Sequence, residues 1–266
     1  MNTGQIILST ALMLSVASIF FIIRSVYDDK KSFLAGQRIF YITGVFILFA
    51  FLFLFYAFMN NDFQYAYVYH NSAKSMPVAY KIAAIWAGNE GSFLIWLLIL
   101  NICGIIAIRK TDIFSPVLLI SVTVAQAFIL LILLVKSPFA FIWNISPQDF
   151  KLWEIPGDGT GMNPLLMDPW MIAHPPILFL GYASSTIPFG YAAAALIKGE
   201  YDTWIKKSYP WVVFSMLTLG VGIFMGGYWA YKVLGWGGYW GWDPVENSSL
   251  IPRIVSVALM HGLMLQ

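Results

Sequence analysis

The stretch Trp236-Gly-Gly-Tyr-Trp-Gly-Trp-Asp-Pro-Val-Glu-Asn-Ser-Ser249 lies between two apolar segments near the end of this 266-residue chain. It places three Trp and one Tyr among three Gly, and it closes on Asp243 and Glu246. Aromatic faces beside glycines form a flat apolar platform that a large planar ligand can approach closely. An interfacial aromatic belt would explain the Trp and Tyr, but not the interleaved glycines or the acidic end. The stretch therefore indicates a ligand platform at the mouth of a membrane helix.

The composition predicts a membrane protein. Hydrophobic residues make up 59% of the chain and charged residues 11%, whereas an ordinary soluble domain carries about 25% charged residues. A net charge of +2 argues against a nucleic-acid partner. We expect an all-α, polytopic transmembrane helix bundle with about seven spans of about 20 residues each. The expected spans are 5–24, 39–59, 83–108 with an interruption, 116–136, 175–197, 209–230 and 250–266.

The distribution of basic residues predicts the topology. Nine Lys and Arg fall in the short connections on one side of the membrane, which are Arg24, Lys30, Lys31, Arg38, Arg109, Lys110, Lys198, Lys206 and Lys207. The other side carries six over much longer loops, so the positive-inside rule places the N-terminus and the Trp-rich stretch outside. Asn163-Pro164 and Asp168-Pro169 in an outer loop are typical helix starts, and they predict two short interfacial helices.

Two of the three histidines are candidate metal ligands. His261 lies in an apolar run, and an ionisable residue at membrane depth marks a functional site by default. Its neutral imidazole suits an axial ligand to haem iron, with an interhelical hydrogen bond as the alternative. His174 begins an expected helix, whose positive end keeps the ring neutral and able to bind metal or to cap the helix. His70 follows an aromatic loop and is interpreted as a solvated residue.

The other polar residues admit more than one role. Asp243-Pro-Val-Glu246 fits a capping box. Arg253 either pairs with an acidic group, such as a ligand carboxylate, or extends to the membrane surface. Glu90 belongs either to a proton or quinol path or to a polar break in its helix. Cys103 is alone and fills apolar space, and the lack of a CxxC pattern excludes a dithiol carrier.

Four segments of the chain together carry a specific family resemblance. The stretch 236–247 resembles the Trp-rich WWD signature of the haem-handling proteins of cytochrome c maturation. The segments 80–92, 163–176 and 258–263 narrow the resemblance to the CcmF and NrfE branch. We therefore divide the chain into N-terminal transmembrane helices at 1–59 and a cytochrome c assembly domain at 60–266. Because members of this branch are more than twice as long, the resemblance implies that the domain is truncated at its C-terminal end.

The resemblance implies a cytochrome c haem lyase in the bacterial inner membrane, with the platform on the periplasmic side. The chaperone CcmE would deliver haem b, a CcmH-type protein would present the apocytochrome, and two CxxCH thiols would add to the haem vinyl groups. His174 would ligate the delivered haem, and His261 would ligate a second, embedded b-type haem reduced by quinol. The platform residues would be Trp236, Gly237, Tyr239, Trp240, Trp242 and Asp243, with Arg253 at the rim. No catalytic residue is assigned.

Two features of the resemblance leave alternatives open. The C-terminal half of the same protein, or a split subunit, would have to supply the second axial ligands. Arg253 stands where the family signature usually has Trp after Pro252. The rival functions are a haem carrier or exporter like the CcmC branch, without ligation activity, and a non-haem membrane transporter or scaffold. The CcmC platform usually lies between two outer histidines, and no histidine follows the platform on the outer side here.

Overall fold

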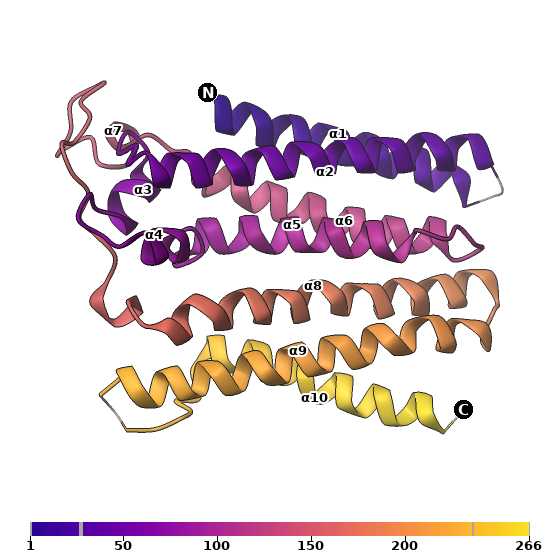
Figure 1. Cartoon of the computed structure of the whole chain (residues 1–266). Coiled ribbons are helices and arrows are strands. Elements are labelled where there is room, and N and C mark those ends of the chain that lie inside the picture. Colours follow the sequence, from indigo (N-terminus) through magenta and orange to yellow (C-terminus); the bar gives the residue numbers. More distant parts are fainter. Residues whose placement is uncertain (1, 27–28, 236, 266) are drawn as a thin grey trace.

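The computed structural model describes residues 2–26, 29–235 and 237–265, which form helices and no strand (Figure 1). The expected all-α class is therefore confirmed. The elements are α1 (Thr3–Ser25), α2 (Lys30–Met59), α3 (Ala66–Asn71), α4 (Val78–Ala84), α5 (Asn89–Ala107), α6 (Ser115–Val135), α7 (Ile142–Ile145), the 3₁₀ helix η1 (Pro164–Leu166), α8 (Pro169–Lys198), α9 (Thr203–Val233) and α10 (Pro244–Met264).

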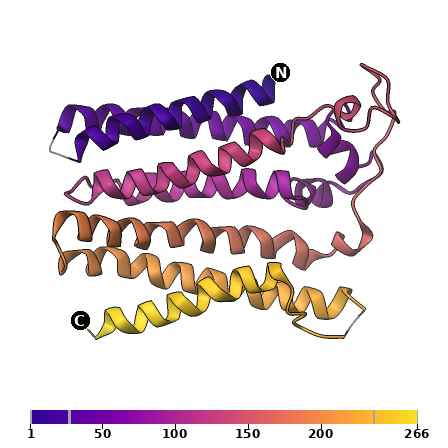
Figure 2. The ribbon, with the colours of Figure 1, turned by 180° about the vertical axis from the view of Figure 1, so that it is seen from behind.

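In the part of the chain that the structure describes, six helices are long and apolar enough to cross a membrane. They are α1, α2, α5, α6, α8 and α9. The sequence predicted about seven spans, of which the last, at 250–266, corresponds to α10. By composition α10 is not apolar enough to be counted with the six. Its 21 residues include Glu246, Arg253 and His261, which lower its hydropathy. Nevertheless α10 runs beside α9 and ends at the opposite end of the bundle from its start (Figures 1 and 2).

The start of α8 differs from the expectation. Asn163 caps the short helix η1 as predicted, since its side chain accepts from the backbone N–H of Leu165. Asp168, however, caps α8 itself, and α8 continues through Pro175 and Pro176 without a break. The prediction of a second, separate interfacial helix is thus wrong. Prolines near the start of a membrane helix are tolerated, because neighbouring groups satisfy the backbone that they leave free.

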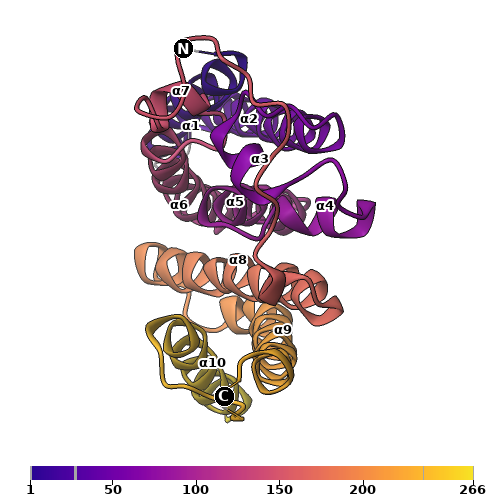
Figure 3. The same cartoon turned by 90° about the vertical axis from the view of Figure 1, so that its left-hand side faces the viewer.

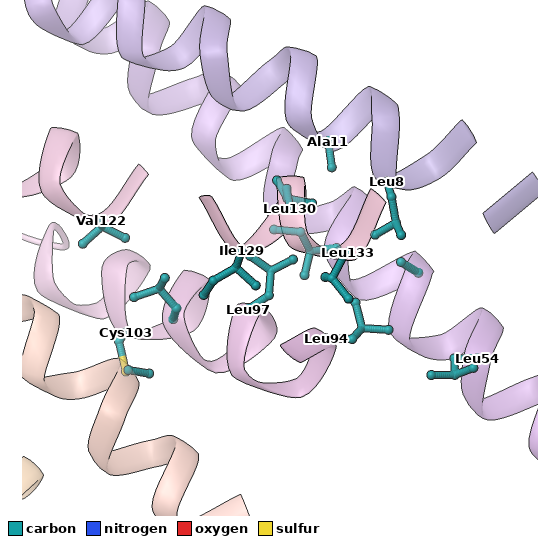
Figure 4. Close-up of a cluster of buried hydrophobic side chains, with 14 of the residues drawn as sticks. Leu8, Ala11, Leu54, Leu94, Leu97, Cys103, Val122, Ile129, Leu130 and Leu133 are labelled. Carbon is teal, nitrogen blue, oxygen red and sulfur yellow. The ribbon is translucent and has the colours of Figure 1, made fainter. Parts of the chain in front are cut away.

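The helices form two groups that meet at α8. Seen end-on, α1, α2, α5 and α6 lie on one side of α8, and α9 and α10 lie on the other (Figure 3). The larger group is filled by buried aliphatic side chains, among them Leu8, Ala11, Leu97, Leu130 and Leu133 (Figure 4). Cys103 is buried in this core, which confirms its predicted role as a small apolar side chain.

One polar network crosses this apolar core. The Asn101 amide donates to the Gln126 side chain (2.9 Å), and the Gln126 amide donates to the Ser15 hydroxyl (2.9 Å). These three side chains come from α5, α6 and α1, and each is 2% exposed or less. Gly44 of α2 leaves room for Asn101, because an added Cβ would stand 2.3 Å from its Oδ1. Since an unsatisfied polar group in hydrocarbon costs several kcal/mol, this network fixes the register of α1, α5 and α6.

We expect Gln126→Leu to destabilise the bundle by about 1 kcal/mol, because it leaves the Asn101 amide buried without a partner. The double variant Asn101→Leu, Gln126→Leu should recover part of that loss, since no orphaned amide remains. Unfolding in denaturing detergent would measure both, with Val124→Leu on the exposed face of α6 as the control. Strictly additive losses in the double variant would show that the two amides do not depend on each other.

Candidate functional site

The candidate site lies at one end of the bundle. The start of α8, the end of α9, residues 237–243 and the start of α10 gather there, together with α3, α4 and α7 (Figures 1 and 2). The N-terminal end of α1 points to this same end (Figure 1). The basic residues at or near the ends of α1, α5 and α8 and the starts of α2 and α9 lie at the opposite end of the bundle (Figures 1 and 2). The arrangement agrees with the predicted topology, in which the N-terminus and the Trp-rich stretch share one side.

The loops 72–74 and 158–161 at this end of the bundle are tied together by hydrogen bonds from backbone N–H groups. The Lys74 backbone N–H donates to the Asp158 carboxylate (2.8 Å), and the Gly161 N–H donates to the Ser72 carbonyl (3.0 Å). The N–H groups of Lys74 and Gly159 hold the pKa of Asp158 below its ordinary value. Because the pKa of Asp158 is lowered, its contribution to stability is fully present above the ordinary pKa of Asp. That contribution is lost as the pH falls through the lowered pKa and the carboxylate is protonated.

Tyr67 holds the backbone of the segment between α4 and α5, which is the interruption expected in the third span. The Tyr67 hydroxyl accepts from the Gly88 N–H (3.0 Å), and burial raises the pKa of Tyr67, so the hydroxyl stays neutral. Gly91 is required, because an added Cβ would stand 1.6 Å from the Ile85 carbonyl oxygen. Glu90 lies in the first turn of α5, partly exposed. This geometry favours the interpretation of the segment as a polar break rather than as a path of buried carboxylates.

An ion pair joins α8 to α9 at the site. Asp168 is 7% exposed; its carboxylate accepts from the Trp170 N–H (2.9 Å) and pairs with Lys232 (2.7 Å). The Trp229 indole N–H donates to the Leu165 carbonyl (3.3 Å). The start of α8 is thereby held against the last turns of α9.

His174 lies in this α8–α9 contact. Its Nδ1 faces Gly226 of α9, where an added Cβ would stand 3.1 Å away, and its ring stacks beside Trp229 with centroids 6.0 Å apart. Nδ1 is buried and has no hydrogen-bond partner within the described ranges. Buried polar atoms are normally paired, so an unpaired imidazole nitrogen is a good candidate for a ligand-binding group.

The Trp-rich connection is shaped by its glycines. Trp236 lies outside the described residues. Gly237 has φ +71°, a conformation that other residues rarely adopt. Tyr239 is 56% exposed and stacks on Tyr231 of α9, with centroids 4.4 Å apart and an interplanar angle of 5°. Gly227 lets the connection approach, because an added Cβ would stand 3.0 Å from the Tyr239 carbonyl oxygen.

Two tryptophans complete the described part of the platform. Trp240 and Trp242 pack edge to face, with ring centroids 6.0 Å apart and an interplanar angle of 83°. Trp242 is 72% exposed and has φ +58°, and the Trp240 indole Nε1 is buried with no hydrogen-bond partner among the described residues. The connection therefore presents open aromatic surface and one unpaired donor, which suits a flat, mostly apolar ligand.

The predicted capping box at the start of α10 is confirmed. The Glu246 N–H donates to Asp243 Oδ1 (2.7 Å), and Glu246 Oε2 accepts from the N–H groups of Gly241 (2.7 Å) and Asp243 (3.4 Å). Glu246 thus holds the end of the platform as well as the helix start. Asp243 thus caps α10, and its assignment to the platform stays a prediction.

Arg253 lies against α9. An added Cβ at Gly220 would stand 2.7 Å from its Nε, and that Nε is buried without a hydrogen-bond partner among the residues that are described. Sequence reasoning did not identify the role of the α9 glycines. Gly222 and Gly226 admit Leu178 and His174 from α8, whereas Gly220 and Gly227 admit Arg253 and the platform. The signal was the spacing Gly220-Val-Gly222 followed by Gly226-Gly227, a small-residue pattern typical of close helix packing.

The structure does not bring His261 to this site. His261 lies roughly 25 Å along α10 from Pro244, at 1.5 Å per residue, close to the opposite end of the bundle. Its side chain is exposed, and Nδ1 contacts the Val257 carbonyl (2.8 Å) of its own helix. His70 is exposed beside Tyr69, as predicted. Any ligands of His174 and His261 would therefore occupy separate places.

Comparisons with known proteins agree with this architecture. The family profile described as "Cytochrome C assembly protein" matches residues 86–266. The chain is 41% identical over 224 residues to the cytochrome c-type biogenesis protein CcmF of Pseudomonas fluorescens, a match covering 82% of this chain and 33% of that relative. It is 38% identical over 262 residues to CcmF of Escherichia coli K12, covering 96% of this chain and 39% of that relative.

A solved structure titled cytochrome c heme lyase CcmF superposes with a TM-score of 0.81 at 28% identity, covering 98% of this chain and 41% of that one. The fold and the comparisons define a polytopic helical membrane protein of cytochrome c assembly. More narrowly, the chain belongs to the CcmF type of the cytochrome c assembly proteins. It spans about a third of the length of the curated relatives it matches.

We expect Glu246→Ala to loosen the platform. The substitution removes the acceptor for two N–H groups, and loss of such a cap costs about 1 kcal/mol. Hydrogen exchange of the amides at 241–243 should speed up roughly fivefold, which is the factor that 1 kcal/mol represents. Val245→Ala, at a 74% exposed neighbour, should leave the exchange unchanged. Equal exchange in both variants would show that Glu246 does not hold the connection.

Proposed function

We propose that this chain is the haem-holding part of a cytochrome c haem lyase that acts in cytochrome c maturation. In this proposal it lies in the bacterial inner membrane with the Trp-rich connection on the periplasmic side. The observation that carries the proposal is the placement of the His174 ring next to the aromatic connection. Nδ1 lies against Gly226 and has no hydrogen-bond partner among the described residues, so Nε2 is the ring nitrogen left to face a ligand. A haem carrier of the CcmC kind would share this platform but would not form thioether bonds.

The residues at the platform fit a haem substrate. His174 would hold the iron of haem through Nε2, because Gly226 closes off Nδ1. Tyr239 and Trp242 offer exposed aromatic faces, and the glycines keep side chains out of the way. The platform also comprises Trp236, Gly237, Trp240 and Asp243. Arg253 lies about 13 Å along α10 from Pro244, at 1.5 Å per residue, with Nε against Gly220 and no partner for it among the described residues. Its guanidinium group would suit a carboxylate such as a haem propionate that reaches this far.

The chain would contribute by orienting its substrate. Bound haem supplies two vinyl groups, and each apocytochrome thiol adds its sulfur and its hydrogen across one C=C bond, so this addition consumes no oxidant or reductant. His174 would fix the position of the ring, and the aromatic side chains would exclude water from its face. Holding reactants in a near-attack geometry is the main source of rate enhancement when no side chain reacts. CcmE as donor and a CcmH-type protein as presenter of the CxxCH segment belong to the same proposal.

The exposed face of α10 is where we expect a helix from outside this chain to pack. Asn247, Ile251, Ile254, Ala258, His261 and Leu265 follow one another at alternating spacings of four and three. From Ile251 onward these side chains are exposed. This is the spacing of a seam that packs against another helix. We propose that a helix from the C-terminal half found in the relatives, or from a split subunit, covers it. That helix would supply the second ligand, opposite His261, to an embedded b-type haem reduced by quinol.

We expect His174→Ala to lower haem retention by the purified, full-length assembly roughly tenfold or more, since the side chain supplies the iron ligand. Absorbance in the Soret region per mole of protein measures this loss, and His70→Ala is the matched outer-face control. Measurement of the haem that becomes covalently attached to a co-expressed apocytochrome distinguishes a lyase from a carrier. Undiminished retention and spectrum in His174→Ala would contradict the ligand assignment, and haem binding without thioether formation would favour the carrier.

A further inference from the structure

A groove separate from the platform opens between α8, α9 and α10 in the half of the bundle that is distant from the Trp-rich connection. Its cavity volume is about 340 Å³, within the range of about 300–1,000 Å³ usual for ligand pockets. The floor is Val212 and Ser215 of α9, each 1% exposed. The rim is Phe189 of α8 (66% exposed) and Val255 of α10 (61% exposed).

The groove offers an almost entirely apolar surface. Three serines line it, but each hydroxyl is already used within its own helix. Ser185 donates to the Tyr182 carbonyl (2.7 Å), Ser215 to the Val212 carbonyl (3.1 Å) and Ser256 to the Pro252 carbonyl (2.8 Å). No charged side chain is among the lining residues. The polar groups left for a ligand are the Trp204 indole N–H at one end and the acceptor lone pairs of the serine oxygens, so a ligand with a polar ring would exchange most of its hydrogen bonds to water for few new ones.

The groove is also distinct from the proposed site of His261. Leu259 lines the groove, and His261 follows two residues later, about 200° around α10 at 3.6 residues per turn. The exposed histidine thus faces away from the groove. A cofactor held by His261 and the contents of the groove would lie on opposite faces of the same helix.

We propose that this groove binds one acyl chain of a phospholipid from the leaflet next to the basic connections. α8 and α9 are long and apolar enough to span the membrane, and the exposed rim at Phe189 lies along α8, so in this proposal the rim opens to the hydrocarbon. Trp204, in the first turn of α9, lines the end of the groove nearest the basic connections. An indole at this level suits the boundary between acyl chain and head group. The bound chain fills the wedge between α8 and α10 and supports α10 from the side opposite to His261.

The test uses photo-crosslinking in the full-length protein, reconstituted in vesicles of phosphatidylethanolamine and phosphatidylglycerol. A trace of phosphatidylethanolamine with a diazirine in its acyl chain serves as the probe, and mass spectrometry maps the labelled residues. Labelling of Ser215, Val255 and Leu259 should exceed that of Val221 on α9, which is 50% exposed and lies outside the groove, by several-fold.

Val255→Trp should fill the rim and reduce labelling of the α9 floor to the level at Val221, whereas Val221→Trp should leave the floor labelled. Ala192→Phe, from the α8 wall, provides a second way to fill the groove if the first variant unfolds. Even labelling of all exposed helix faces would contradict the proposal, because it would show only bulk lipid. Displacement of the probe by an isoprenoid quinone, at a concentration where unlabelled phosphatidylethanolamine has no effect, would also contradict it.

Discussion

The close packing of α9 against a neighbour on each side is the constraint on which the rest of the site depends. A membrane helix gains little from the hydrophobic effect when it packs on another helix, so close backbone approach and interhelical polar contacts must hold it. Glycines on one face of α9 admit α8 and His174, and glycines on another face admit Arg253 and the Trp-rich connection. The ion pair between Asp168 and Lys232 fixes the ends of α8 and α9. The imidazole of α8 and the aromatic connection after α9 are consequently both positioned by contacts with α9.

The two halves of the bundle are stabilised differently. α1, α2, α5 and α6 share a dense aliphatic core with one fully paired polar network, so they form a support for α8. α10, in contrast, buries only Ser249 and Leu263 and leaves a regular apolar seam open. The seam and the groove that we assign to an acyl chain lie on different faces of α10. The position of this helix, and hence of His261, would then depend on what occupies those two surfaces.

Local features of the sequence predicted local structure well. The capping residues Asn163 and Asp243 have the predicted hydrogen bonds because a cap depends on only a few neighbouring residues. Hydropathy located the spans well because it, too, depends only on residues that are neighbours in the sequence. One prediction about helices failed at prolines, because α8 continues through Pro175 and Pro176. Polar residues leave α10 outside the helices that are apolar enough to span by composition, although it runs beside α9.

Features that depend on the tertiary fold could not be predicted from the sequence. The sequence marked His174 as a candidate, but its burial and its unpaired nitrogen result from Gly226, a residue of another helix. An apolar run around His261 indicated membrane depth, yet it did not indicate which face of α10 carries the ring.

Resonance Raman spectroscopy of the iron–imidazole bond in the ferrous, haem-loaded assembly tests the central claim most directly. If His174 is the ligand and Gly226 sets its position, Gly226→Ala must shift that vibration, because the new Cβ would stand 3.1 Å from Nδ1. Gly157→Ala, in an outer loop where an added Cβ meets nothing within 4 Å, should leave the vibration as in the unaltered protein. An identical vibration in all three proteins would contradict the account.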